Sequence, residues 1–212
     1  MQPHSSLRAR TKRRLLGLDR SGPPPKPTLR GEPLRPLTIP NLIGFVRLAM
    51  IPVFLVIALS SHDGRSTAAA VLFAVIGWAD YLDGFTARLT GQFSRLGALL
   101  DPVIDRTLVV AGMIVVWDFN LLPRLALAIV IARELLMLVL SEMSLRRGID
   151  IKINWLGRIG VAPTMGSPFF AMVGVHWLAL ILLYVGMTLA LSSTAVYVQH
   201  GGRELRKLSS SA

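Results

Sequence analysis

Long apolar runs separated by short islands of charge are the feature that most restricts how this chain can fold. Of its 212 residues, 52% are hydrophobic and only 17% are charged. A helix that crosses a membrane needs about 20 mostly apolar residues in succession. Windows of that kind occur at roughly 39–60, 66–88, 96–117, 121–145, 155–173 and 177–199. We therefore predict an all-α fold, a polytopic membrane bundle of six transmembrane helices within residues 38–200.

Basic residues are concentrated ahead of the first apolar run. Nine of the 23 Lys and Arg residues lie in the first 37 positions. We expect residues 1–37 to form a basic, Pro-rich, disordered tail and residues 201–212 a second, short basic tail. No aromatic residues are interleaved with the basic block, which favours anionic lipid headgroups over nucleic acid as its partner.

The loops between the windows differ in charge, and this difference predicts the orientation of the helices. Arg88, Arg95 and the basic segment 146–158 lie on the same side as the two tails, whereas the opposite loops carry only Arg65 and Arg124. By the positive-inside rule, both termini are expected in the cytoplasm and the protein in the cell membrane.

The tryptophans support the placement of the windows. Trp117, Trp155 and Trp177 fall at predicted helix ends, where interfacial aromatic residues are enriched. Trp78 lies deeper in its window, and we expect it to be packed against neighbouring helices.

Four aspartates lie within or beside the apolar windows, where each costs about 2.5 to 3.5 kcal/mol at a helix centre. One such residue often lies at the interface or pairs with an arginine. The spacing of these four is regular, however. Asp80 and Asp83 are three residues apart and fall on one face of a predicted helix, and Asp101 and Asp105 are four residues apart and share a face of the next one. A hairpin of the two helices would bring the stripes together.

Facing carboxylates favour hard divalent cations. The chain has no cysteine, which excludes thiolate metal sites and cysteine nucleophiles, and oxygen ligands suit Mg²⁺ or Mn²⁺ better than zinc. Glycines on the same stripes, Gly84 and Gly97, would leave room for a phosphate. Arg88, Ser94 and Arg95 add donors for phosphate oxygens.

Together these residues spell Asp80-x2-Asp83-Gly84-x2-Ala87-Arg88-x8-Gly97-x3-Asp101-x3-Asp105, which resembles the signature of the CDP-alcohol phosphatidyltransferase family at every position. The resemblance covers about residues 37–199. It implies a six-helix membrane bundle, commonly a homodimer, with a polar cavity open to the cytoplasm. It also implies two ions, Mg²⁺ or Mn²⁺, held by the four aspartates, with Asp105 acting in addition as general base. The implied contacts to the CDP-activated lipid are Asn41, Arg47, Gly84, Ala87, Arg88, Ser94 and Gly97.

Basic residues beyond the signature are the basis for predicting the acceptor alcohol. Arg133, Lys152 and Arg158 predict an anionic acceptor such as glycerol 3-phosphate. The segments 131–134 and 154–158 resemble the phosphatidylglycerophosphate synthase branch, although Arg158 stands where that branch usually has a lysine. The implied reaction transfers a phosphatidyl group from CDP-diacylglycerol to glycerol 3-phosphate and releases CMP.

Other functions remain open at this stage. Cardiolipin synthase of the CDP-alcohol type and phosphatidylinositol phosphate synthase share the same core motif. A divalent-cation transporter also needs acidic residues within the membrane, but it does not account for Gly84, Arg88 and Gly97 at their spacing. A purely structural membrane protein is the third alternative.

Overall fold

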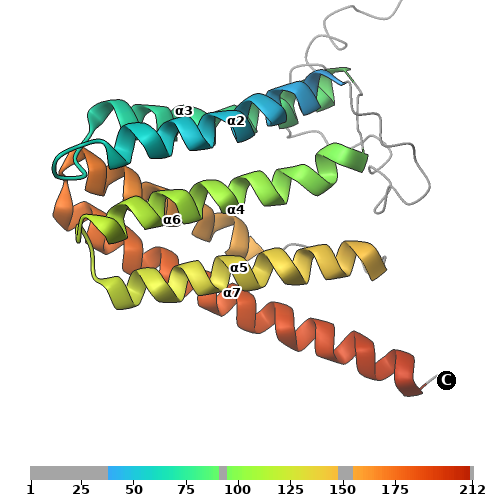
Figure 1. Cartoon of the computed structure of the whole chain (residues 1–212). Helices are drawn as coiled ribbons and strands as arrows, with labels where there is room; N and C mark the ends of the chain where they lie inside the picture. The colour runs from blue at the N-terminus through green and yellow to red at the C-terminus, as the bar shows by residue number, and fades with distance from the viewer. Residues whose placement is uncertain (1–37, 91–94, 148–154, 211–212) are drawn as a thin grey trace, which may run out of the picture.

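The computed structural model describes residues 38–90, 95–147 and 155–210, and every regular element within them is a helix. The prediction of an all-α fold is therefore confirmed. Figure 1 shows the helices lying roughly along one direction. In chain order they are α2 (Ile39–Leu59), α3 (Thr67–Thr90), α4 (Arg95–Asp118), α5 (Arg124–Arg147), α6 (Trp155–Val173) and α7 (His176–Ser210).

Local signals start the helices where the sequence predicts them. The Thr38 hydroxyl accepts a hydrogen bond from the Asn41 amide at 3.4 Å, and Pro40 lies in the first turn of α2, where a missing N–H costs nothing. The Ser66 hydroxyl accepts one from the Ala69 amide at 3.2 Å ahead of α3. The last helix differs from the prediction, because α7 continues past residue 199 to Ser210.

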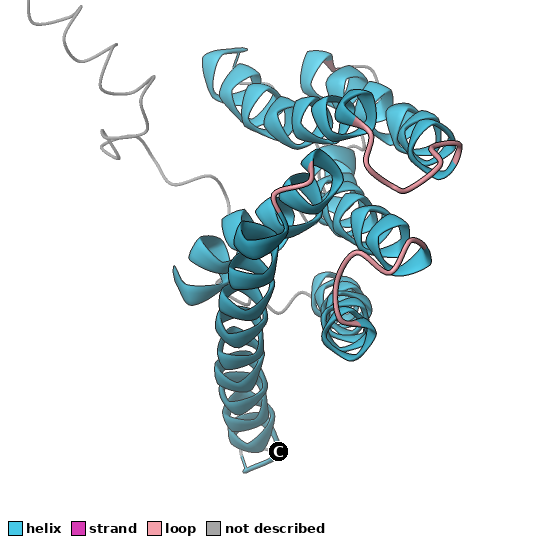
Figure 2. Cartoon of the chain, turned by 90° about the vertical axis from the view of Figure 1, so that its left-hand side faces the viewer, coloured by secondary structure: helices cyan, strands magenta, loops and turns pink. Residues whose placement is uncertain are grey.

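Three short connections, α2 to α3, α4 to α5 and α6 to α7, lie at one end of the bundle, as Figures 1 and 2 show. Gly64 has a φ of 71°, and a Cβ there would lie 2.5 Å from Cγ of Phe119, so only glycine fits the first connection. Gly174, between α6 and α7, has a φ of 92°. Two of the tryptophans predicted at helix ends, Trp117 and Trp177, also lie at this end of the bundle.

Helix α4 lies between two hydrophobic clusters and contributes to both. The first cluster joins α4 to α2, α3 and α6 and includes Phe54, Phe73, Ile104 and Leu108. The second joins it to α5, α6 and α7 and includes Met113, Val116, Leu127, Val130 and Leu183. The core is therefore two packed groups that share one helix.

Helices α6 and α7 approach closely at a glycine. A Cβ at Gly186 of α7 would lie 2.7 Å from Oγ1 of Thr164 and 2.9 Å from its backbone nitrogen. The Thr164 hydroxyl donates to the Gly160 carbonyl at 2.7 Å, which satisfies its polar group inside the contact. Backbone approach at small residues is a common way for membrane helices to pack.

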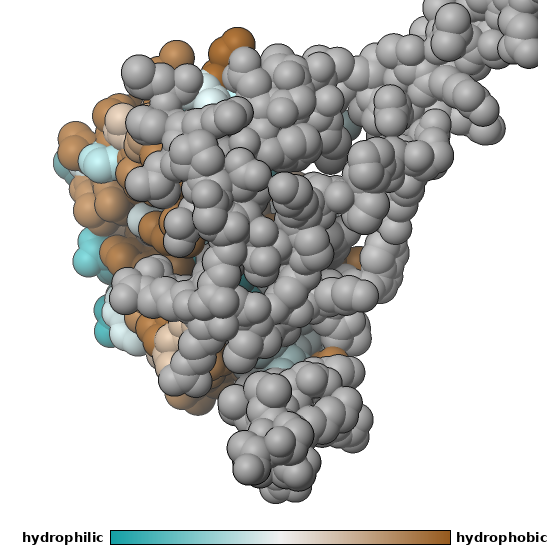
Figure 3. Space-filling model, turned by 90° about the vertical axis from the view of Figure 1, so that its right-hand side faces the viewer, coloured by the Kyte–Doolittle hydropathy of each residue, from teal (hydrophilic) through white to brown (hydrophobic). Residues whose placement is uncertain are grey.

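The outer surface is largely apolar, and Figure 3 shows hydrophobic side chains on the described part of one flank. Exposed large apolar residues include Leu42, Val53 and Val56 of α2 and Ile181 and Val185 of α7. Trp78 belongs to this surface with 64% exposure, so the prediction that it packs within the chain is wrong. Such a surface fits contact with lipid.

Two of the described segments are long and apolar enough to cross a membrane: α2, and His176–Tyr197 within α7. Thr67–Leu82 and Ile159–Val173 are shorter apolar segments. Helices α4 and α5 interrupt their apolar runs with charged residues, among them Asp105, Arg106 and Glu134. These features mark a membrane protein, while the count of six spans stays a prediction.

Candidate active site

Arg47 of α2 organises the acidic part of the site. Its side chain is 1% exposed, and its Nε donates to the Ile76 carbonyl at 3.1 Å. Nη1 donates to Oδ1 of Asp80 at 2.9 Å, and Nη2 donates to Oδ1 of Asp105 at 2.8 Å. Helix α2 packs against both α3 and α4, so one guanidinium reaches a carboxylate on each.

The charges in this group do not cancel. Arg47, Asp80 and Asp105 taken by themselves carry a formal charge of −1 when both carboxylates are ionised. The guanidinium is buried, but the side chains of Asp80 and Asp105 are each 43% exposed. The two carboxylates can therefore bind a further cation without giving up the arginine.

The other two predicted metal ligands lie one helical turn away from this pair. Asp101 precedes Asp105 by four residues on α4 and is partly buried. Asp83 follows Asp80 by three residues on α3, which continues to Thr90, two residues beyond the predicted window. The Asp83 side chain lies outside the described part of the structure. Within the described side chains, no three acidic or histidine residues are grouped closely enough to hold a metal ion.

The donor set nevertheless suits a hard divalent cation. Asp80 and Asp105 offer only oxygen atoms, and both accept from a single guanidinium, which keeps them close together. Carboxylate oxygens are the ligands that Mg²⁺ and Mn²⁺ prefer. The residues that would hold such an ion are these two, with Asp83 and Asp101 as the remaining predicted ligands.

The residues predicted to contact the CDP-activated lipid are placed unevenly. Asn41, in the first turn of α2, is 3% exposed, and Gly97 near the start of α4 is partly buried. The backbones of Gly84, Ala87 and Arg88 belong to the last two turns of α3. Nothing is described of the Arg88 side chain, and Ser94 lies outside the described residues.

A second charged group joins α4, α5 and α7. Glu134 accepts from Nη1 of Arg106 at 2.6 Å through Oε2, and from Nη1 of Arg133 through Oε1. Nε of Arg133 donates to Oγ1 of Thr194 at 3.1 Å. The side chains of Glu134, Arg133 and Arg106 are 7%, 11% and 23% exposed. Two arginines around one glutamate leave a formal charge of +1.

The predicted acceptor residues are only partly described. Arg133 belongs to the second charged group, as just outlined. Arg158 lies in the first turn of α6, but its side chain is outside the described part, and Lys152 lies outside the described residues altogether. Sequence reasoning missed Arg106, although an arginine directly after Asp105 in an apolar run was a signal available for it.

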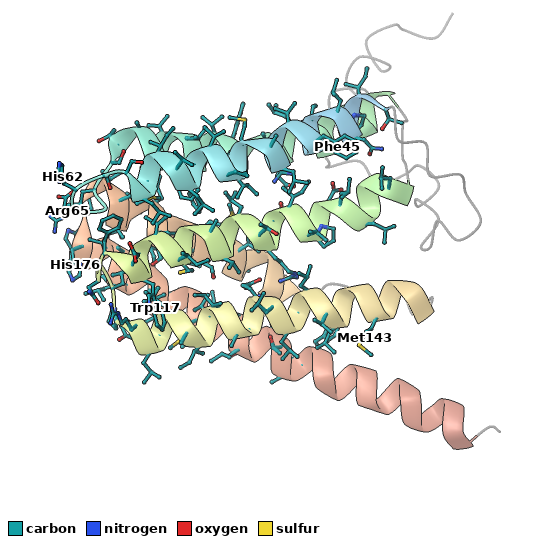
Figure 4. The ribbon with its side chains drawn as sticks, viewed as in Figure 1. Phe45, His62, Arg65, Trp117, Met143 and His176 are labelled. Carbon is teal, nitrogen blue, oxygen red and sulfur yellow. The ribbon has the colours of Figure 1, made fainter. Side chains whose placement is uncertain are left out.

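A surface cavity of about 480 Å³ lies at the end of the bundle where the three short connections are found. It is lined by residues of the first two connections, among them His62 and Arg65, and by His176, the first residue of α7, all labelled in Figure 4. Asp80 and Asp105 do not line it. The polar cavity predicted on the cytoplasmic side stays a prediction.

The fold and the site together define an α-helical membrane protein with carboxylates from two neighbouring helices gathered on a buried arginine. The family model for CDP-alcohol phosphatidyltransferase matches residues 37–197, and the chain belongs to this family. The predicted family is therefore confirmed, and the chain is a transferase of phospholipid biosynthesis. Members of this family generally depend on a divalent cation, and family membership does not specify which one.

Curated relatives carry two different names. The chain is 32% identical over 169 residues to "Cardiolipin synthase (CMP-forming)" of Streptomyces coelicolor, covering 77% of this chain and 79% of that protein. It is 29% identical over 175 residues to "CDP-diacylglycerol--glycerol-3-phosphate 3-phosphatidyltransferase" of Shigella flexneri and of Escherichia coli, covering 79% of this chain and 96% of each relative. The first name gives cardiolipin as the product, whereas the second gives glycerol 3-phosphate as a substrate.

Proposed function

We propose that this chain transfers the phosphatidyl group of CDP-diacylglycerol to glycerol 3-phosphate, forming phosphatidylglycerophosphate and releasing CMP. The observation that carries the proposal is the pair Asp80 and Asp105, joined on Arg47 inside a chain of the CDP-alcohol phosphatidyltransferase family. The similarity to the Shigella and Escherichia enzymes supports the choice of acceptor.

In the proposed reaction, the acceptor hydroxyl oxygen attacks the phosphorus on the lipid side of the pyrophosphate. The new oxygen–phosphorus bond forms as the bond to CMP breaks, and CMP leaves with the electron pair. Asp105 takes the proton from the acceptor hydroxyl, a role worth about 10²- to 10⁴-fold in rate. A bound divalent cation supplies neutralisation of the phosphate charge.

Arg47 has a positioning role in this mechanism. Its guanidinium is buried and fixed by the Ile76 carbonyl, so it holds the carboxylates of Asp80 and Asp105 at a set separation. Fixed carboxylates provide a cation site that needs no reorganisation when substrate binds. Arg47 was predicted to contact the CDP-activated lipid, and we retain that contact as a further role.

We assign the remaining predicted residues by the same logic. Gly84, Ala87, Arg88, Ser94 and Gly97 follow or precede the acidic turns of α3 and α4, where they would face the cytidine diphosphate. Asn41 would act from the first turn of α2. On the acceptor side we place Lys152 and Arg158, with Arg133 in the wall that α5 contributes.

For the membrane arrangement we propose six spans, with both termini in the cytoplasm and the acidic site near the cytoplasmic face. The three short connections would then face the opposite side. The homodimer and two-ion occupancy implied by the family resemblance belong to the same proposal. Ion pairs join α4 to α2 and to α5, and they lower the cost of placing these charged side chains in a lipid environment.

A panel of acceptors tests the reaction. Purified protein in lipid nanodiscs receives CDP-diacylglycerol, Mg²⁺ and one acceptor at a time: glycerol 3-phosphate, phosphatidylglycerol, inositol phosphate or glycerol. CMP release and product mass by mass spectrometry are measured together. The proposal expects phosphatidylglycerophosphate with glycerol 3-phosphate as the fastest acceptor.

Cardiolipin synthesis is the second candidate, favoured by the 32% identity to the Streptomyces coelicolor protein. Faster CMP release with phosphatidylglycerol than with glycerol 3-phosphate would establish it in place of the first. A chain that released no CMP with any acceptor, but carried Mn²⁺ into proteoliposomes, would instead be a transporter.

A further inference from the structure

The second charged group contains a buried hydrogen-bond donor that no described residue accepts from. Nε of Arg106 is buried and has no hydrogen-bond partner within the described structure, while Nη1 of the same side chain binds Glu134. Buried polar groups are nearly always hydrogen-bonded, and an unpaired one costs about 1 to 3 kcal/mol, more for a charged group. The exception is therefore informative.

The charge of this group is also unmatched. Arg106 and Arg133 share the single carboxylate of Glu134, so one positive charge has no counterion among the residues they contact. A water molecule could satisfy the Nε donor but not the charge. An anionic oxygen satisfies both, and guanidinium groups bind phosphate oxygens with strong, charge-assisted hydrogen bonds.

Arg106 is also in the right place for a substrate. It follows Asp105 directly on α4, and successive residues of a helix point about 100° apart around its axis. Asp105 turns toward α2 and Arg106 toward α5. Both side chains are partly exposed, at 43% and 23%. A small molecule lying across this part of α4 can meet the carboxylate with a hydroxyl and the guanidinium with an anionic group.

We propose that Arg106 binds the phosphate of the acceptor and thereby selects a phosphorylated alcohol. The inference rests on the proposed function, since it assumes that Asp105 receives the hydroxyl proton of the same molecule. Arg133 has a different role: its Nε is occupied by Thr194 and its Nη1 by Glu134. Arg133 is a positioning residue that fixes Glu134, and Glu134 in turn orients Arg106.

A matched pair of conservative variants tests the role of Arg106. Arg106→Lys keeps a cation beside Glu134 but removes the guanidinium donors, whereas Arg124→Lys makes the same chemical change at an exposed residue in the first turn of α5. For Arg106→Lys, the KM for glycerol 3-phosphate should rise about tenfold or more, because a hydrogen bond to a charged group is lost. The KM for CDP-diacylglycerol should stay unchanged. Arg124→Lys should keep both KM values near those of the wild type.

A direct binding measurement separates this inference from the proposed function. Thermal unfolding of the full chain in detergent is followed with glycerol 3-phosphate alone, inorganic phosphate alone, or phosphatidylglycerol in mixed micelles. The phosphate contact is supported if glycerol 3-phosphate or phosphatidylglycerol stabilises the wild type but not Arg106→Lys. Which of the two ligands stabilises the protein shows whether the phosphate belongs to a soluble or a lipid acceptor. This readout remains valid even if no CMP is released, which would defeat the proposed function alone.

Three results would overturn the inference. The first is equal stabilisation and equal KM values in the wild type and Arg106→Lys, which would leave the Nε donor to water. The second is an identical rise in KM for Arg106→Lys and Arg124→Lys, which would show that the effect is not specific to Arg106. The third is a rise confined to CDP-diacylglycerol. Should Arg106→Lys fail to fold, the double variant Arg106→Gln with Glu134→Gln keeps the formal charge of +1 while removing the guanidinium, and the same readouts apply.

Discussion

Asp80 and Asp105, on different helices, accept hydrogen bonds from two nitrogens of one buried guanidinium, at 2.9 and 2.8 Å. This relationship makes Arg47 the residue on which the acidic site depends. It also sets the distance between a carboxylate of α3 and a carboxylate of α4 without requiring those two helices to pack tightly against each other.

Replacing Arg47 by methionine should destabilise the protein and inactivate it. Removing one partner of a buried ion pair costs about 3 to 5 kcal/mol, and the two carboxylates would then repel each other. The melting temperature in detergent and CMP release should both fall. Arg65→Met, at the exposed turn after α2, is the control and should change neither. An active and fully stable Arg47→Met protein would contradict the role of this residue.

The variant Asp105→Asn should keep its fold and lose turnover. Asparagine still offers Arg47 an oxygen acceptor, but it cannot take a proton from the acceptor alcohol. CMP release should drop by about 10²- to 10⁴-fold or more, with little change in melting temperature. Asp118→Asn provides a matched control, since Asp118 is an exposed residue at the far end of the same helix. Turnover near that of the wild type would remove Asp105 as the base.

Chelation should abolish CMP release, and added Mg²⁺ or Mn²⁺ should restore it. Oxygen donors hold these ions, and the carboxylates repel each other more strongly when the ions are removed. The melting temperature of the wild type should therefore rise when Mg²⁺ is added back. The double variant Asp80→Asn with Asp105→Asn should show a much smaller rise. An equal rise in both proteins would place the cation elsewhere.

The close contact of α6 and α7 predicts a difference between two glycines. Gly186→Ala would push a methyl group to within 3 Å of the Thr164 backbone, and overpacking of this kind costs about 1 to 3 kcal/mol. At Gly44 the same change meets only Cδ1 of Ile104, at 3.5 Å, an ordinary contact. The melting temperature should therefore be lowered by Gly186→Ala and unchanged or raised by Gly44→Ala. The reverse order would show that the helices separate more easily than the packing implies.

Helix positions were predictable from the sequence, because each apolar run is bounded by charge, proline or a capping hydroxyl such as Thr38. The end of α7 was not. Hydropathy predicts where lipid contact stops, whereas a helix continues for as long as its residues favour it, and residues 203–208 contain good helix formers. Trp78 was misjudged for a related reason, since a position deep in an apolar run can face lipid as readily as protein.

The closeness of Asp80 and Asp105 was also predictable, because each belongs to a local pattern of spacing three or four on neighbouring helices. The contacts of Arg47 were not, since its partners lie 33 and 58 residues away and depend on α2 packing between α3 and α4. Glu134 illustrates the same limit. Its pairing with the adjacent Arg133 could be suggested from the sequence. The ion pair with Arg106, 28 residues earlier, could not, because it depends on how α4 and α5 pack.

Helix α4 contributes side chains to both hydrophobic clusters, and this shared membership bears on how the protein is assembled. A helix that carries Asp101, Asp105 and Arg106 is not stable in lipid by itself, so its position depends on contacts with the helices on both sides of it. The segments before α4 and those after it must both be present before α4 can adopt its final packing. Truncated chains that end after α5 should therefore be degraded rather than persist as half-built bundles, and denaturation of the full chain should proceed as one cooperative transition.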